Sequence, residues 1–166
     1  MAILSANKNR PVRIPAGGLT TAELKLAGYT NFGGGSTAHT VYKGSVVVSD
    51  ISDTDGYFRA APITSSTAAA AADIFGGIAA EKVEVKSTDA ADGSKKLTVF
   101  RDGVWGFPVG GCAITDIGAP AFASDDDTIT TSSVNNFQVG IVEDVDATYV
   151  WVNIHDQSMK PSASTT

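Results

Sequence analysis

LTVFRDGVWGF, residues 97–107, is the stretch of sequence that decides the fold. β-branched and aromatic residues stand on both sides of Asp102-Gly103, and an Asp-Gly pair between two such runs is a strong signal for a turn. This composition favours strands, because β-branched and aromatic side chains pack well on a pleated sheet. The stretch therefore predicts β-structure in the core, and it carries no sign of a catalytic loop.

Other segments have the same character and are separated by Gly, Asp, Ser and Thr. Residues 41–48 contain a valine run that is typical of a strand covered on both faces. Residues 81–86 alternate charged with apolar side chains, as a half-exposed strand does. Residues 137–145 and 148–154 predict a last pair of strands. We therefore expect an all-β fold, either a small β-barrel or a β-sandwich.

Three segments depart from this pattern. Residues 1–40 contain prolines, glycines and few large apolar side chains, so we expect an extended N-terminal arm that orders only against another surface. Residues 65–73 place five alanines after Ser and Thr and predict a short surface helix. Residues 156–166 are polar, and we expect a flexible C-terminal tail. The β-domain is accordingly expected to span residues 41–155.

The charge of the chain is unevenly distributed. It has 12 basic and 18 acidic residues, a net charge of −6. An acidic chain argues against general nucleic-acid binding, which needs clustered Lys and Arg. Residues 1–25 nevertheless carry four basic residues against Glu23, so a basic arm precedes an acidic body. The alternative is that these charges only keep a flexible terminus solvated.

The sequence argues against several other classes of protein. No apolar run approaches the length of about 18 residues that crosses a bilayer, and residues 1–10 lack the apolar block of a secretory signal. Cys112 is the only cysteine, so no internal disulfide is expected, and one cysteine with two histidines leaves little for a zinc site. We expect no membrane association, no metal and no cofactor.

Acidic turns and histidines are the remaining candidates for chemistry. Residues 53–56 form an acidic turn that lacks the ligand spacing of an EF-hand. Residues 125–127 are three aspartates at the tip of a predicted hairpin, where neighbouring side chains point to opposite faces, so a solvated turn is favoured over a cation site. His39 and His155 belong to no GxSxG or HExxH motif. We therefore expect that the protein is not an enzyme.

The order of short motifs after Tyr42 resembles the small capsid decoration, or cement, proteins of tailed bacteriophages. The motifs are GSVVV at 44–48, GIAA at 77–80, VFRDGV at 99–104, AI at 113–114, IGAPAF at 117–122, TITT at 128–131, VGIV at 139–142 and VWV at 150–152. The resemblance covers roughly residues 42–154. Residues 1–40 and the alanine-rich insertion at 65–73 depart from the shorter family members.

This resemblance implies a compact β-barrel or β-sandwich domain, β-tulip-like, on the outer surface of an icosahedral head. Such a virion protein is assembled in the host cytoplasm, often as a homotrimer. It stabilises the capsid by non-covalent bridging of neighbouring major capsid proteins. No catalytic residues are implied, because the family is structural.

Two groups of residues are candidates for contacts with partners. Basic and apolar residues of the arm would dock on an acidic or grooved capsid surface by adding a strand to a sheet edge; they are Lys8, Arg10, Pro11, Arg13 and Ile14. Tyr149 and Trp151 share one face of the last strand, opposite the valines, and would form a subunit interface.

A carbohydrate-binding or adhesive β-domain is the alternative function. Sugar sites commonly place aromatic rings beside polar groups, and Tyr149, Trp151 and Trp105 could supply such rings. Packing of these aromatics in the core or at a subunit interface is the competing interpretation.

Overall fold

The structure is a computed structural model that describes residues 4–30, 36–49, 56–61, 73–134, 136–155 and 157–159. Within these ranges the regular secondary structure consists of antiparallel β-strands and one short 3-10 turn, η2 (Ile114–Asp116). The strands form no closed barrel there. The predicted all-β class is therefore confirmed, while the predicted helix at 65–73 lies outside the described residues except for Asp73.

The strands are arranged in two sheets and a ribbon. The six-stranded sheet has the order β1 (Val12–Arg13), β9 (Val104–Pro108), β13 (Tyr149–Asn153), β12 (Phe137–Val145), β10 (Pro120–Ala123) and β11 (Ile129–Thr130). The five-stranded sheet has the order β2 (Thr21–Lys25), β8 (Lys96–Phe100), β6 (Ile74–Ala79), β4 (Val46–Ser49) and β5 (Phe58–Ala60). The ribbon pairs β3 (His39–Val41) with β7 (Val83–Val85).

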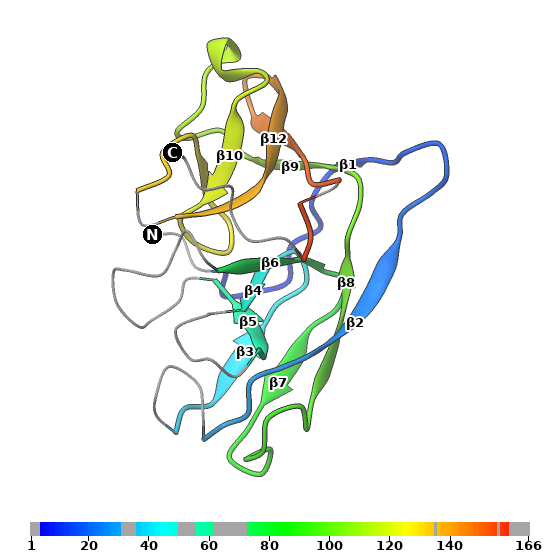
Figure 1. Ribbon diagram of the computed structural model, residues 1–166, viewed down its shortest axis with the longest axis vertical. Coiled ribbons are helices and arrows are strands. Elements are labelled where there is room, and N and C mark those ends of the chain that lie inside the picture. Colours follow the sequence, from blue (N-terminus) through cyan, green and yellow to red (C-terminus); the bar gives the residue numbers. More distant parts are fainter. Residues whose placement is uncertain are drawn as a thin grey trace.

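These units stack as three layers, with the five-stranded sheet in the middle. In Figure 1, β10 and β12 lie toward the top, β4 and β6 in the middle, and β3 and β7 toward the bottom. Val46 and Val48 pack in the cluster shared with the six-stranded sheet, whereas Val47 packs in the cluster shared with the ribbon. The prediction that this valine run is covered on both faces is thus confirmed, although the chain between 41 and 46 leaves the strand.

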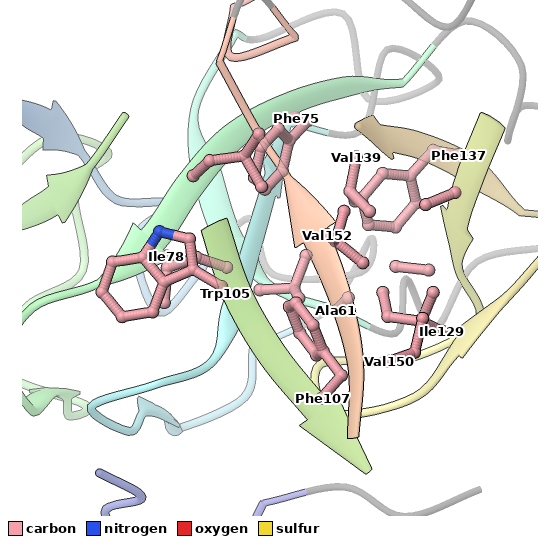
Figure 2. Close-up of a cluster of buried hydrophobic side chains, with 14 of the residues drawn as sticks. Ala61, Phe75, Ile78, Trp105, Phe107, Ile129, Phe137, Val139, Val150 and Val152 are labelled. Atoms are coloured by element: carbon pink, nitrogen blue, oxygen red, sulfur yellow. The ribbon is translucent and has the colours of Figure 1, made fainter. Parts of the chain in front are cut away.

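The larger core lies between the six-stranded and the five-stranded sheet. Figure 2 shows Phe75 and Ile78 of β6 facing Trp105 and Phe107 of β9, with the β13 side chain of Val152 nearby. Trp105 is 4% exposed and Phe107 is fully buried. The 97–107 stretch therefore does form core β-structure.

Asp102-Gly103 is a corner between the two sheets. β8 pairs with β2 and β6, whereas β9 pairs with β1 and β13, so the flanking strands are not partners. The corner is held by the Trp105 Nε1–H, which donates to the Asp102 carbonyl oxygen at 2.8 Å. Gly103 has φ +104°, and a Cβ there would lie 2.8 Å from the side chain of Leu19. Only glycine meets both demands without strain.

The predicted N-terminal arm is wrong for residues 4–30, which belong to the folded body. Val12 pairs with Trp105 and Arg13 with Val104, so β1 is an edge strand of the six-stranded sheet. β2 pairs along its whole length with β8. Hydrogen bonds to strands far away in the sequence help to offset the conformational entropy that this segment loses when it becomes ordered.

The C-terminal end of the described chain also contacts the body. The backbone N–H of Met159 donates to the carbonyl oxygen of Phe75 at 2.7 Å, and Ser158 Oγ donates to the carbonyl oxygen of Gly76 at 3.1 Å. Within the predicted flexible tail, 156–166, Ser158 and Met159 are therefore bonded to β6. Residues 156 and 160–166 lie outside the described ranges.

Candidate functional site

A buried charge cluster joins the N-terminal segment to the turn between β10 and β11. The side chain of Arg10 has 0% relative exposure and that of Asp127 has 10%. Arg10 Nη2 lies 2.7 Å from Asp127 Oδ1, and Lys8 Nζ lies 2.8 Å from Asp127 Oδ2. Each charge is tolerated in this place because the other one compensates it.

Arg10 is held by more than this ion pair. Its Nε donates to the carbonyl oxygen of Gly44, and its Nη2 donates to the carbonyl oxygen of Asp126 at 2.9 Å. The guanidinium carbon also lies 4.2 Å from the ring centroid of Phe107. Burial lowers the pKa of Arg10, and the Asp127 carboxylate opposes that shift. Arginine nevertheless stays charged, because its ordinary pKa lies far above physiological pH.

Two predictions about these residues are wrong. Asp125 and Asp126 are each 1% exposed and Asp127 is 8% exposed, so the aspartate turn is buried rather than solvated. Arg10 is 6% exposed and its charge is used inside the molecule, so it offers no docking contact to a capsid. The basic segment and the acidic turn neutralise each other, which no reading of either segment alone could indicate.

Asp126 makes the stability of the fold depend on pH. Burial is the main cause that raises the pKa of Asp126 from 3.8 to about 6. The folded protein therefore holds this proton more tightly than the unfolded chain, and the associated stabilisation is complete below pH 4 and is lost as the pH rises through about 6.

Asp126→Asn is expected to remove this dependence. Asp126 accepts hydrogen bonds from the Leu4 N–H at 3.0 Å and from Ser45 Oγ at 3.0 Å, and an amide can keep both contacts with Ser45 as acceptor. The variant should be more stable than the wild type by about 2 kcal/mol at pH 8 and equally stable near pH 4. Urea unfolding at several pH values measures this, and an unchanged pH slope would contradict the assignment.

The outer face of the six-stranded sheet is the second notable feature and the better candidate for a binding surface. Strand pairing aligns one row of residues across five strands, from β1 through β9, β13 and β12 to β10. Paired residues lie on the same face of a sheet, so this row forms a continuous line. Its members are Arg13, Val104, Asn153, Ile141 and Pro120.

Two adjoining depressions lie along this row. The first has a volume of about 630 Å³, and Ile117 and Ile141 contribute its exposed apolar side chains. The second has a volume of about 410 Å³ and includes Ile14 and Val104. Both are lined by Glu143, Asn153 and His155. We call this surface, with both depressions, the outer-face groove.

The polar groups of the outer-face groove hold one another in place. Asn153 Nδ2 donates to Glu143 Oε2 at 3.0 Å. His155 Nδ1 lies 3.2 Å from Asp102 Oδ1, and Asp102 Oδ1 also accepts the N–H of Gly103 at 2.7 Å. The two depressions thus present exposed apolar side chains beside carboxylate, amide and imidazole groups.

The predicted interface residues Tyr149 and Trp151 lie beside this row and are partly buried. Their ring centroids are 5.7 Å apart, and Trp151 Nε1 donates to Asp146 Oδ2 at 2.7 Å. The guanidinium of Arg13 lies 4.1 Å from the centroid of the Trp151 ring, and Arg13 also pairs with Asp144 at 2.8 Å. Thus the structure brings Arg13, a predicted arm residue, together with Trp151, a predicted interface residue.

The other predicted arm residues have different places. Ile14 is 63% exposed and lines the outer-face groove. Pro11 packs over Gly106, where a Cβ would lie 2.7 Å from the proline ring. Lys8 remains partly exposed while it pairs with Asp127. Whether any of these residues touches a capsid stays a prediction.

Sequence reasoning missed the groove residues that come from strands, above all Ile141, Glu143 and Asn153. Ile141 belongs to the apolar run VGIV, in which nothing in the sequence distinguishes exposed from buried residues. In the structure Val142 is buried and Ile141 is 43% exposed. The alternation of faces along β12 was the available signal. It is obscured by a change of register between Val142 and Asp144.

The described residues contain neither a cluster of potential metal ligands nor a membrane-spanning helix. Within the described ranges, no group of three or more His, Cys, Asp or Glu side chains is placed to hold a metal ion. No helix in the same ranges is long and apolar enough to span a bilayer. Cys112 is partly buried, and burial raises the pKa of its thiol, which disfavours the reactive thiolate.

Comparison with known proteins adds no relative. No family model matches the chain, and no match was found among curated proteins or solved structures. The function is therefore inferred from the residues and their geometry.

Proposed function

We propose that this protein is a structural, non-enzymatic virion protein that binds the outer surface of a bacteriophage capsid. It would stabilise the capsid as a decoration protein, by non-covalent bridging of neighbouring major capsid proteins after assembly in the host cytoplasm. The observation that carries the proposal is the outer-face groove, a wide and shallow surface with exposed isoleucines on the six-stranded sheet. Exposed apolar patches with a polar rim commonly mark protein–protein contacts.

Two further features support this function. The ordered motifs between residues 42 and 154 resemble those of cement proteins, and the motifs GSVVV, VGIV and VWV contribute buried side chains to the packed core. Three stacked β-layers give a body that presents its outer face with little change of shape, which reduces the entropy lost on binding. A homotrimer would add avidity, because three linked contacts dissociate far more slowly than one.

Co-sedimentation tests the proposal. The purified chain is mixed with expanded, undecorated heads of the phage whose genome encodes it, and bound protein is measured in the pellet. We expect saturable binding and greater resistance of the heads to heat. Light scattering of the free chain should give the mass of three copies. A chain that stays in the supernatant at every ratio would overturn the proposal.

A carbohydrate-binding or adhesive β-domain remains the second candidate, favoured by the partial exposure of Trp151 and Tyr149 at the surface. It has less support. Trp105, the third aromatic considered for a sugar platform, is buried in the core at 4% exposure. The ring of Trp151 is already stacked on the Arg13 guanidinium. Reproducible binding on a glycan array would favour this alternative.

A further inference from the structure

Apolar and acidic side chains alternate along the length of the outer-face groove. At one end Ile117 and Ile141 are 49% and 43% exposed, and at the other end Ile14 is 63% exposed. Glu143 lines both depressions and stands between these apolar ends. The surface thus offers an apolar, an acidic and again an apolar position.

The charges of this face are unequal. Arg13 is the cation in the described part of the row, and it is paired with Asp144 at 2.8 Å. The carboxylate of Asp102 faces His155, and that of Glu143 is bonded to the neutral amide of Asn153. The described strands of the six-stranded sheet contain no lysine, and from residue 101 onward the only Arg or Lys residues in the sequence are Arg101 and Lys160. Neither Glu143 nor Asp102 therefore has a Lys or Arg partner among the described residues of this face, and Glu143 is the one of the two that lines both depressions.

We infer that the outer-face groove binds an extended segment of the partner protein in which a Lys or Arg side chain stands between two apolar side chains. The basic group would meet Glu143, and the apolar groups would enter the hollows at Ile117–Ile141 and at Ile14–Val104. Charge complementarity selects this occupant, because an acidic segment would be repelled by Glu143 and Asp102. The inference deepens the proposed function and rests on it in taking the major capsid protein as the partner.

An extended segment fits because alternate side chains of a strand point the same way. Residues i, i+2 and i+4 share a face, with about 7 Å between successive side chains on that face. A sequence such as Leu-Ser-Lys-Ser-Leu therefore presents apolar, basic and apolar groups in line. Exposed isoleucines become buried on binding, and the ion pair adds specificity more than affinity.

Two variants in the groove and two matched controls test the surface on capsids. Ile141→Ser removes an apolar wall, and Glu143→Lys reverses the central charge. Val134→Ser changes a side chain that is 71% exposed elsewhere, and Glu23→Lys reverses a charge on β2, in the other sheet. We expect each groove variant to bind heads at least about tenfold more weakly, with wild-type melting curves, and both controls to bind as the wild type does. Equal binding by all four variants would overturn the inference and leave the proposed function standing.

A second measurement does not depend on capsids. The ¹⁵N-labelled chain is titrated to about millimolar concentration with acetylated Leu-Ser-Lys-Ser-Leu amide, and in parallel with the peptide that has Glu in place of Lys. We expect chemical-shift changes at Glu143, Asn153 and their neighbours with the Lys peptide only, weakened by added salt. Equal shifts with both peptides, or shifts elsewhere, would overturn the inference. If heads do not bind the wild-type chain, the proposed function fails and this titration alone decides the surface.

Discussion

Asp127→Asn is expected to lower the free energy of unfolding by about 3–5 kcal/mol. The substitution leaves the Arg10 guanidinium buried, with 0% side-chain exposure, and removes the carboxylate that compensates it at 2.7 Å. Lys8 loses its partner at the same time, which adds little because that side chain reaches solvent. Urea unfolding monitored by tryptophan fluorescence measures the loss.

Asp144→Asn is the matched control for this prediction. It breaks an ion pair of similar length, Arg13 to Asp144 at 2.8 Å, but both side chains are substantially exposed at 45% and 38%. Solvent screens such a pair, so a loss of about 0–1 kcal/mol is expected. Similar losses from Asp127→Asn and Asp144→Asn would show that the buried cluster contributes no more than a surface pair, contrary to our interpretation.

Replacement of both buried partners gives a third comparison. An Arg10→Met, Asp127→Leu double variant leaves no unpaired charge, so it should be markedly more stable than Asp127→Asn alone. The isolated charge, rather than the lost attraction, would then be the main cost. A double variant as unstable as the single one would instead indicate that the carbonyl contacts of Arg10 hold the segment.

Phe107→Ala is expected to cost about 3–5 kcal/mol of stability. Phe107 is fully buried on β9 in the core between the two large sheets, close to Val150 and Val152 in Figure 2. The substitution leaves a cavity there and removes the ring that lies against the Arg10 guanidinium. Thermal and urea unfolding measure the loss.

Val134→Ala is the control, because a side chain that is 71% exposed should change stability by no more than about 0.5 kcal/mol. Combining Phe107→Ala with Asp127→Asn gives a further check. Both residues contact Arg10, so their effects should not be additive. Strict additivity would mean that Arg10 does not couple the charge cluster to the core.

Much of the strand structure could be predicted from residue pattern. The valine run at 46–48, the last pair of strands and the Asp-Gly turn all appear close to their expected places, since β-branched and alternating residues have few other ways to bury their side chains. The partners of those strands could not be predicted. The runs on either side of Asp102-Gly103 enter different sheets, because pairing depends on contacts between residues far apart in the sequence.

The candidate site was less accessible to sequence reasoning. Arg13, Ile14 and Trp151 were expected to contact partners, and the structure places all three on or beside one face of the six-stranded sheet. Glu143 and Asn153 drew no attention, because one acidic and one amide residue in a strand have no distinctive spacing. They become candidate binding residues only because the strand register places Asn153 beside Ile141 and Val104.

The sequence by itself determined the all-β class, the covered valine strand and an overall excess of acid, because these follow from local side-chain chemistry. Only the tertiary structure decided which charged side chains of residues 8–13 and 125–127 are buried and which partners they have. Separately, a basic segment and an acidic turn each favour solvent, but together they lose that preference, because an ion pair can be buried when each charge compensates the other. That pairing uses the charges of Lys8 and Arg10 inside the molecule, whereas Arg13 and Ile14 line the outer-face groove, the candidate binding surface.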